Sequence, residues 1–410
     1  MGSVRVLINA YACSPNMGSE PGMAWNWCVN LAKHCELHII TEGEFRDEIE
    51  RVVPTLPQGK NMHFYYNPVS EDVRKMCWNQ GDWRFYWHYE KWQKSTLEIA
   101  KRVCADNKID ILHQLNMIGF REPGYLWKIV DKPFVWGPVD AKDSFPVAYL
   151  HNAGLKSKII TNAKNTITKL QLLASSRVRK AVERSSFVIS ASSESKRSFK
   201  RYFNVDSPLL NETGCYVSQR DISVEKSIGD SFNTLWVGKL DLRKQLYLAI
   251  RAIARSKVKD VKLHIVGAGD DKAYKRLAQQ EGVEDQCIWY GLLPFGKVQE
   301  MMRTSDLFLF TSVAEGTPHV VLESIGNNLP VLCFDVCGHG DSVDESVGVK
   351  IRLSNPDQSI VDFSEQIKYL YNHRDVLAEM SHNCKERSEV LSWDNKARQM
   401  VALYNQTLSI

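Results

Sequence analysis

The stretch "LFLFTSVAEGTPHVVLESIGNNLPVLCFD", residues 307–335, contains the pattern from which the fold can be predicted. It opens with a continuous apolar run, passes through a loop, and enters a helix-like segment near Thr317 and Pro318. Thr317 can cap that helix, and Pro318 suits its first turn. A second apolar run, residues 329–335, closes the stretch. Continuous apolar runs are typical of parallel strands buried on both faces, so the stretch predicts strand, loop, helix and strand.

The same alternation runs along the whole chain of 410 residues. Strand-like runs occupy residues 4–10, 36–41, 63–68, 110–115, 133–138, 186–192, 233–239, 261–269, 286–292, 306–312 and 329–335, with helical patterns at 243–256 and 272–282. Strands that alternate with helices predict the α/β class. The length suits two or three domains of roughly 100–200 residues. We expect two doubly wound, Rossmann-like domains joined near residues 205–230.

Composition excludes several classes of protein. Hydrophobic residues make up 44% and charged residues 24%, as in ordinary soluble proteins. The net charge of +4 is too small to indicate nucleic-acid binding. No apolar run approaches the ~18 residues that span a bilayer, and Arg5 and Asn9 interrupt the first run, so we expect no signal peptide. Ten scattered cysteines without a Cys-x-x-Cys pair predict free thiols in the cytoplasm.

Two glutamates, Glu315 and Glu323, flank seven residues of the quoted stretch. His319, Glu323 and Asn327 follow at helical spacing and predict a polar stripe, and Gly326 predicts a close approach of this helix to another segment. A helix N-terminus favours an anion such as a phosphate. One carboxylate beside it would suit a sugar hydroxyl or a developing positive charge, and the other a ribose diol. The alternative is that both glutamates are solvated surface residues.

The segment from Glu315 to Asp335 resembles the E-x7-E region of retaining glycosyltransferases of family 4, which have the GT-B fold of two Rossmann-like domains facing across a donor cleft. The resemblance continues, in order, through residues 236–252, 263–278 and 288–312. In the first half, "MGSEPG" at 17–22 loosely resembles the family's Gly-Gly-Ser-Glu loop.

The resemblance implies how the chain is divided. We expect an N-terminal, acceptor-side domain over residues 1–208. The nucleotide-sugar-binding domain would cover 209–391, and a final helix over 392–410 would pack back on the first domain.

The resemblance also implies an activity and its residues. The chain would be a metal-independent, retaining hexosyltransferase without a cofactor, using a UDP- or GDP-sugar. Lys239 and Lys244 would hold the diphosphate, and Glu315 would lie beside the donor sugar, which makes these three the candidate catalytic residues. Fixed cations can stabilise a leaving diphosphate without a metal. The other implied donor contacts are Gly18, Gly238, Gly316, Thr317, His319 and Glu323.

One position departs from the family. Many relatives carry a histidine where Gly137 and Pro138 stand, and His113 is a weak candidate to replace it on the acceptor side. The chain contains no Asp-x-Asp, which agrees with a site that uses no metal. Two alternatives stay open. One is a non-catalytic sugar-nucleotide binding protein. The other is a dinucleotide-dependent oxidoreductase, although Lys272 occupies the third glycine position of "GAGDDK".

Two segments suggest where an acceptor binds. Between Lys156 and Arg201, twelve basic residues face two glutamates, a net charge of +10, and isoleucines and leucines are interleaved among them. Such a stretch could lie on an anionic membrane or form a solvated helix face. The aromatic-rich residues 78–93 could line an acceptor groove or belong to the core. We therefore expect a lipid-linked or polysaccharide acceptor of cell-surface polysaccharide synthesis, peripheral contact with the inner face of the plasma membrane, and no nucleic acid.

Overall fold

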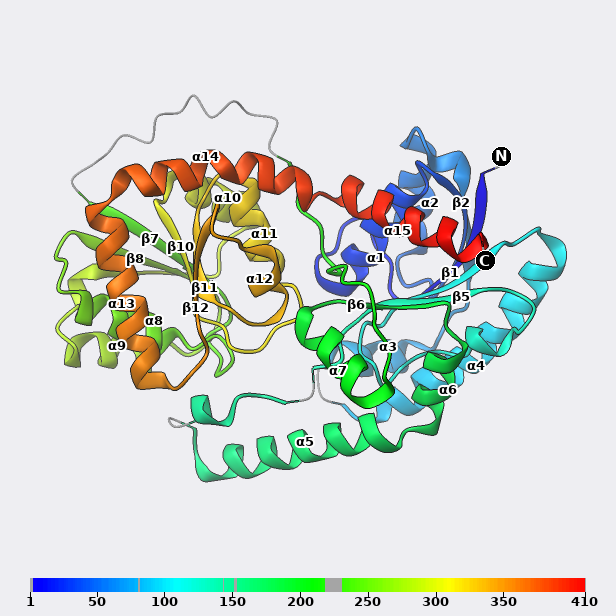
Figure 1. Ribbon diagram of the computed structural model, residues 1–410, viewed down its shortest axis with the longest axis horizontal. Coiled ribbons are helices and arrows are strands. Elements are labelled where there is room, and N and C mark those ends of the chain that lie inside the picture. Colours follow the sequence, from blue (N-terminus) through cyan, green and yellow to red (C-terminus); the bar gives the residue numbers. More distant parts are fainter. Residues whose placement is uncertain (1–2, 80–81, 143, 151–152, 218–230, 410) are drawn as a thin grey trace. The chain divides into compact units, whose positions relative to one another are not determined.

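The chain divides into two compact units (Figure 1). The computed structural model describes residues 3–79, 82–142, 144–150, 153–217 and 231–409. Unit 1 comprises Met1–Asp143, Lys169–Glu212 and Trp393–Ile410, and unit 2 comprises Ser144–Thr168 and Thr213–Ser392. The later part of the expected join, residues 218–230, lies outside the described residues.

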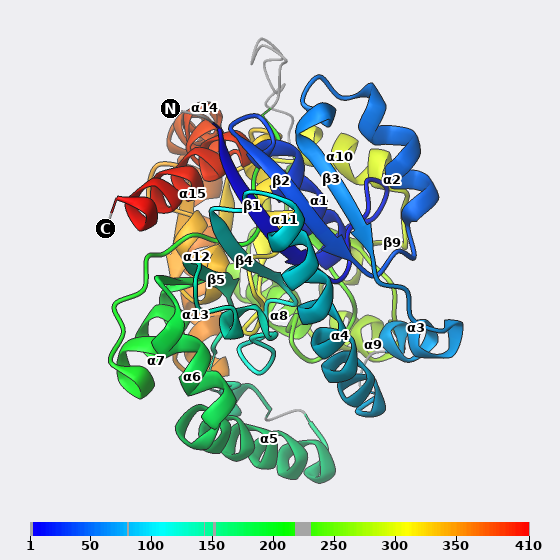
Figure 2. The same cartoon turned by 90° about the vertical axis from the view of Figure 1, so that its right-hand side faces the viewer.

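Unit 1 is built on a six-stranded parallel sheet in the order β3-β2-β1-β4-β5-β6. The order reverses beside β1, as in doubly wound folds, and Figure 2 shows β1 to β4 and their helices. The strands are β1 (Val4–Ala10), β2 (Cys35–Thr41), β3 (Met62–Tyr66), β4 (Ile111–Asn116), β5 (Phe134–Val139) and β6 (Phe187–Ser190). The helices are α1 (Ser19–Leu31), α2 (Arg46–Val52), α3 (Glu71–Trp78), α4 (Arg84–Asp106), α6 (Ser176–Arg184), α7 (Ser193–Phe203) and α15 (Trp393–Leu408).

Both faces of this sheet are apolar, which explains the continuous runs in the sequence. Along β1, Val6 and Ile8 pack in one buried cluster, and Leu7 packs in another on the opposite face. The final helix α15 belongs to the first of these clusters. Its Trp393 ring meets the Trp27 ring edge-on, with centroids 5.9 Å apart.

Unit 2 contains a second six-stranded parallel sheet, in the order β12-β11-β10-β7-β8-β9. Its strands are β7 (Phe232–Val237), β8 (Val261–Val266), β9 (Cys287–Gly291), β10 (Leu307–Phe310), β11 (Val331–Phe334) and β12 (Gly348–Ile351). Its helices are α8 (Leu246–Ser256), α9 (Lys272–Gln280), α10 (Phe295–Thr304), α11 (His319–Gly326), α12 (Cys337–Ser342), α13 (Pro356–Asn372) and α14 (Arg374–Val390). The short edge strand β12 was not predicted, because its exposed Lys350 and four-residue length give no clear apolar run.

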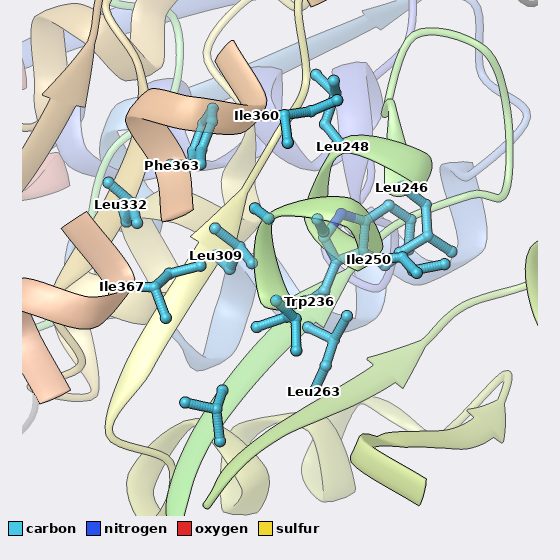
Figure 3. Close-up of a cluster of buried hydrophobic side chains, with 14 of the residues drawn as sticks. Trp236, Leu246, Leu248, Ile250, Leu263, Leu309, Leu332, Ile360, Phe363 and Ile367 are labelled. Carbon is cyan, nitrogen blue, oxygen red and sulfur yellow. The ribbon is translucent and has the colours of Figure 1, made fainter. Parts of the chain in front are cut away.

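The core of unit 2 also has two sides. Leu309 of β10 and Leu332 of β11 pack against α8 and α13 (Figure 3). The neighbouring Phe308 and Phe310 point to the other face, where α10 and α11 cover the sheet. The predicted α/β class with two doubly wound sheets is confirmed.

The unit boundaries differ from the expected ones chiefly in one segment, and residues 209–212 also group with unit 1. Residues 144–168 group with unit 2, although the sequence placed them in the first domain. The reason is Tyr149, which is buried in the core of unit 2 and whose hydroxyl lies 2.7 Å from Ser359 Oγ. The helix α5 (Leu155–Ala174) continues across the division. No helix in the described part of the chain combines the length and apolarity that crossing a bilayer requires.

Candidate functional site

The predicted residues Glu315 and Lys244 meet in unit 2. Glu315 lies in the loop after β10, and its Oε1 is 2.9 Å from Lys244 Nζ. Both side chains are only about one-eighth exposed, at 13% and 12%. Ser312 Oγ lies 2.6 Å from the same Glu315 oxygen and donates to it. Two side chains 71 positions apart therefore form one shielded ion pair at the carboxyl end of a central strand.

Hydrogen bonds fix the backbone beneath this pair. The Lys244 carbonyl accepts from Thr311 Oγ1 at 2.8 Å, and the Arg243 carbonyl accepts from Val313 N at 3.0 Å. Lys244 Nζ also lies 4.8 Å from the centre of the Phe310 ring, within cation–π range. The turn before α8 is thus tied to the end of β10, which holds the ammonium in place before any ligand arrives.

A third cation, Arg243, was not predicted. Its Nη2 lies 2.9 Å from Asp241 Oδ2. Burial opposes the charge, but Asp241 and the field of Glu315 outweigh it and raise the pKa of Arg243. Lys239 is exposed in the same loop. The loop therefore presents three cations against Asp241, and adjacency to Lys244 was the sequence signal that could have identified Arg243.

Glycines shape the floor of this loop. A Cβ at Gly267 would lie 1.7 Å from the Gly238 carbonyl oxygen, and Gly267 has a φ of +155°. Leu240 N donates to the Ala268 carbonyl at 2.9 Å. The "GAGDDK" glycines thus serve close packing of two loops. A Cβ on Gly238 itself would lie 3.2 Å from Lys244 Cδ, so this glycine makes room for the lysine stem.

The helix start differs from the prediction. Helix α11 begins at His319 with Pro318 in the capping position, so Thr317 is not its cap. Thr317 is buried, and a Cβ on Gly338 would lie 2.1 Å from its Oγ1. Gly338 N donates to the Gly316 carbonyl at 3.0 Å. Contact with α12 therefore replaces the expected cap, and the roles of Gly316 and Thr317 as donor contacts stay predictions.

Glu323 and His319 lie one turn apart on α11, as the spacing predicted. Burial raises the pKa of Glu323 to about 7, while a hydrogen bond from Gln299 Nε2 at 3.2 Å acts in the opposite direction. Burial lowers the pKa of His319, whose Nε2 lies 3.4 Å from Thr213 Oγ1. The alternative of a fully solvated carboxylate is wrong for Glu323.

The close approach predicted for Gly326 is confirmed. A Cβ at this position would lie 2.6 Å from the Tyr216 carbonyl oxygen and 3.2 Å from Cys215 Sγ. The glycine lets the end of α11 pack directly on the segment that leads into unit 2.

His113 of unit 1 has a structural position. Its Nδ1 lies 2.6 Å from the Tyr404 hydroxyl of α15, and its Nε2 lies 2.6 Å from the Gly137 carbonyl oxygen. The ring is completely buried, and burial lowers the pKa of His113 to about 4. Because both nitrogens are engaged and no surface is exposed, His113 lacks the access that contact with an acceptor requires.

Gly18, the other predicted residue of unit 1, directly precedes α1 and is exposed. A Cβ there would meet nothing within 4 Å, so packing does not require a glycine at this position. Its role toward a diphosphate stays a prediction.

Unit 1 contains a cavity of about 310 Å³ at the carboxyl ends of β1, β2 and β4. Its wall contains both aromatic side chains and carboxylates, among them Tyr11, Glu20, Glu42, Glu44, Trp78, Phe85 and Tyr86. Burial, with added repulsion from Glu20, Glu44 and Glu42, raises the pKa of the Cys77 thiol in this wall to about 11. Of the carboxylates in the wall, Glu42 is paired with Arg74 at 2.8 Å.

The aromatic segment 78–93 contributes both to the core and to the wall of the cavity. Tyr89 and Trp92 belong to a buried cluster, whereas Trp78 and Tyr86 line the cavity. Phe85 does both.

The comparisons with known proteins agree with this architecture. Residues 218–389 match the family described as glycosyl transferases group 1. The putative glycosyltransferase EpsD of Bacillus subtilis is 23% identical over 180 residues, 43% of this chain and 46% of that protein. An N-acetylgalactosaminyltransferase of Campylobacter jejuni, whose name specifies a diphospho-undecaprenol-linked acceptor, is 32% identical over 124 residues, 30% of this chain and 33% of that protein. The matches thus span about half or less of these two relatives.

Solved structures extend the likeness in fold to the whole chain. WaaG, a glycosyltransferase of lipopolysaccharide biosynthesis, has a TM-score of 0.59 at 15% identity, covering 97% of this chain and 99% of that one. HepE of Anabaena in complex with UDP has a TM-score of 0.61 at 13% identity, covering 98% and 100%. At such identities the likeness establishes the fold alone. Residues 218–389 thus carry the pattern of the group 1 glycosyl transferases, and the chain has the two doubly wound sheets of the GT-B fold.

Proposed function

We propose that the protein is a retaining, metal-independent glycosyltransferase that moves a hexose from a UDP- or GDP-sugar to a lipid-linked or polysaccharide acceptor. The Lys244–Glu315 ion pair carries the proposal. It lies at the carboxyl end of a central strand, where doubly wound sheets bind ligands. It also lies inside the region that matches the family.

The chemistry follows from the charges of the loop. A departing nucleoside diphosphate gains negative charge, and Lys244, Lys239 and Arg243 offer cations on one short loop. When a diphosphate engages Lys244, Glu315 loses its ionic partner, keeps its hydrogen bond from Ser312, and can face the donor sugar, where positive charge develops. Because Lys244 is already held by Thr311 and Phe310, little reorganisation is needed.

Glu323 would hold the ribose. In its ionised form the carboxylate accepts hydrogen bonds from both hydroxyls of a diol. The Gln299 amide that now donates to it keeps the side chain oriented. The likeness to UDP-bound HepE supports a uridine donor, and a guanosine donor is the second candidate.

The cavity of unit 1 would receive the acceptor. The faces of Tyr11, Phe85 and Trp78 suit the apolar side of a sugar ring, and the carboxylates suit its hydroxyl groups. The names of the Campylobacter relative and of WaaG associate those proteins with a diphospho-undecaprenol carrier and with lipopolysaccharide. We extend that setting to this chain as synthesis of a cell-surface polysaccharide such as capsule, exopolysaccharide or lipopolysaccharide.

Helix α5 supports a site of action at the cytoplasmic face of the membrane. Its outward residues are apolar and between 43% and 75% exposed, namely Leu155, Ile159, Ile160, Ile167, Leu170 and Leu173. Its inward side is partly polar, since Asn165 exchanges two hydrogen bonds with the Phe145 backbone. Lys156, Lys164 and Lys169 accompany the apolar stripe. A helix that turns its apolar side outward and carries lysines suits an anionic lipid surface.

The test uses the full chain with a panel of UDP- and GDP-sugars, with and without a chelator. Release of nucleoside diphosphate that depends on Glu315 and survives the chelator is expected, and NMR of the product should show retained anomeric configuration. If sugar nucleotides bind but no acceptor or water turns them over, the protein is a non-catalytic binding module. Oxidoreductase chemistry is disfavoured, because Gly267 is required by its contact with Gly238.

A further inference from the structure

Three potential metal ligands gather on unit 1, away from the cavity. Glu36 and His38 lie two residues apart on β2 and so point to the same face of the sheet. His63 lies on β3, directly opposite His38 in the parallel register. One donor atom from each of the three lies within 4.8 Å of the others. The pairing of β2 with β3 thus brings together two histidines and a glutamate that form no recognisable motif in the sequence.

The spacing of the donor atoms suits a small divalent cation. His38 Nε2 and His63 Nε2 each lie 3.5 Å from Glu36 Oε1. Two ligands bound at ~2.0–2.1 Å to a tetrahedral zinc ion lie roughly 3.3 Å apart. The two imidazole rings are 4.9 Å apart between centroids and tilted by 33°. Small rotations of the exposed His63 side chain would bring its Nε2 close enough to bind the same ion as His38 and Glu36.

The surroundings prepare His38 to bind. Its side chain is only 3% exposed, yet its Nε2 makes no hydrogen bond within the described residues. Its Nδ1 lies 2.9 Å from the Tyr65 hydroxyl. If Nδ1–H donates to that hydroxyl, the lone pair of Nε2 faces Glu36, which is how partners beyond the ligands usually orient a metal-binding histidine.

The carboxylate is prepared as well. Arg5 Nε donates to Glu36 Oε2 at 2.9 Å, which leaves Oε1 for a further partner. A buried imidazole whose Nε2 makes no hydrogen bond to a described residue, a second imidazole and an oriented carboxylate together form a ligand set with coordination positions left open.

We propose that Glu36, His38 and His63 bind a divalent cation of the zinc class. Two imidazoles and one carboxylate suit Zn²⁺, with Co²⁺ as a spectroscopic substitute, better than Mg²⁺ or Ca²⁺, which prefer oxygen ligands. The site lies toward the amino ends of β2 and β3, whereas the cavity lies at the carboxyl ends. Since β3 is the edge strand, as Figure 2 shows, the ion would fasten that edge to β2 and stabilise unit 1.

The experiment titrates the metal-stripped full chain with Co²⁺ and then displaces it with Zn²⁺. Visible absorption of the intensity typical of four- or five-coordinate Co²⁺ is expected at one equivalent, and Zn²⁺ should raise the thermal midpoint. His63→Ala is the informative variant, because His63 is 44% exposed and its loss leaves the core intact. The variant should bind at least roughly 100-fold more weakly, since loss of even an outer-sphere partner costs 10–100-fold.

His34→Ala provides the matched control. His34 is also an exposed histidine of unit 1, close in sequence to β2 but outside the cluster. It should bind Co²⁺ like the parent, and Glu36→Gln should repeat the loss seen in His63→Ala. Equal binding by His63→Ala and the parent, or no Co²⁺ absorption in the parent, would overturn the proposal and leave the cluster as two histidines sharing one carboxylate.

Discussion

At the residue scale, the Lys244–Glu315 ion pair holds in place two charged groups that the proposed reaction would use. Exposed ion pairs contribute about 0–1 kcal/mol to stability, and this one is shielded but still reaches solvent. Its two members are the groups that the proposed reaction needs for opposite purposes, one for the diphosphate and one for the sugar. Ligand binding would therefore exchange one ionic partner of Lys244 for another.

Lys244→Ala should weaken binding of a nucleoside diphosphate and leave nucleoside binding unchanged. A charge-assisted contact is worth about 1.5–3 kcal/mol, which is about one to two decades of affinity. Calorimetry with both ligands measures this directly. Lys297→Ala is the matched control, because Lys297 also pairs with a glutamate, Glu300 at 2.8 Å, but on the exposed helix α10. Equal losses for both ligands in Lys244→Ala would indicate damage to the fold and contradict the assignment.

Glu315→Gln should separate binding from chemistry. Removing the charge frees Lys244, so nucleoside diphosphate should bind at least as tightly as in the parent. Transfer should nevertheless fall on the order of 100-fold or more, as when preorganised electrostatic groups are removed from other enzymes. Steady-state kinetics and calorimetry on one preparation decide the matter. Near-normal turnover would remove Glu315 from the reaction.

Glu323 predicts a pH dependence that can be checked in two ways. Its folded pKa of about 7 lies above the ordinary 4.5, so between these values the folded state binds more protons than the unfolded state. The contribution of Glu323 to stability therefore falls as pH rises through this window. Relative to Glu323→Gln, the parent should lose thermal stability between pH 5 and 8.

The same titration should affect ribose recognition. A carboxylate accepts hydrogen bonds better than a neutral carboxyl group, so the parent should prefer UDP over 2′-deoxy-UDP more strongly at pH 8 than at pH 6. Glu323→Gln should show a small preference that does not change with pH. A parent preference that is flat across this range would separate Glu323 from the ribose.

At the element scale, α5 combines features that a water-facing helix normally avoids. Replacing Ile159, Ile167 and Leu170 together with serine should weaken cosedimentation with anionic vesicles roughly tenfold or more, because buried apolar area is lost. Added salt should weaken binding of the parent by screening its lysines. Leu292→Ser is the control, since Leu292 is 79% exposed but lies outside α5. A parent protein that ignores anionic vesicles at low salt would make the stripe a solvated surface only.

At the scale of the whole molecule, the chain passes between the units four times, at residues 143–144, 168–169, 212–213 and 392–393. The last passage delivers α15 to unit 1, where Trp393, Met400 and Tyr404 are buried. No single cut therefore yields both units complete.

A chain ending at Ser392 should lose the stability of unit 1 and keep that of unit 2. The truncation exposes the core around Trp27 and removes the hydroxyl that binds the buried His113. An unsatisfied buried group alone costs about 1–3 kcal/mol. Calorimetry should show that the thermal unfolding transition of unit 1 is lost or shifted to a much lower temperature. Two transitions like those of the full chain would contradict this account of α15.

Sequence patterns alone were enough to predict the α/β class, every strand except β12, and the candidate pair of glutamates. Continuous apolar runs and helical spacing are local signals, so they survive without knowledge of neighbours. The loop motif around Glu315 is equally local, because strand, loop and helix follow one another in the chain. Thr317 is an exception within this stretch, because it contacts Gly338 and does not cap α11 as expected.

Which distant side chains meet depends on how the elements pack, and the sequence patterns carry no signal for it. Lys244 reaches Glu315 because β7 and β10 are neighbours in the sheet, and periodicity does not encode strand order. His113 sits inside because α15 returns to cover it. Glu36, His38 and His63 come together through the register of β2 and β3, which is fixed by burial of whole faces and not by the ligands themselves. Local patterns specify elements, whereas packing among elements assembles sites.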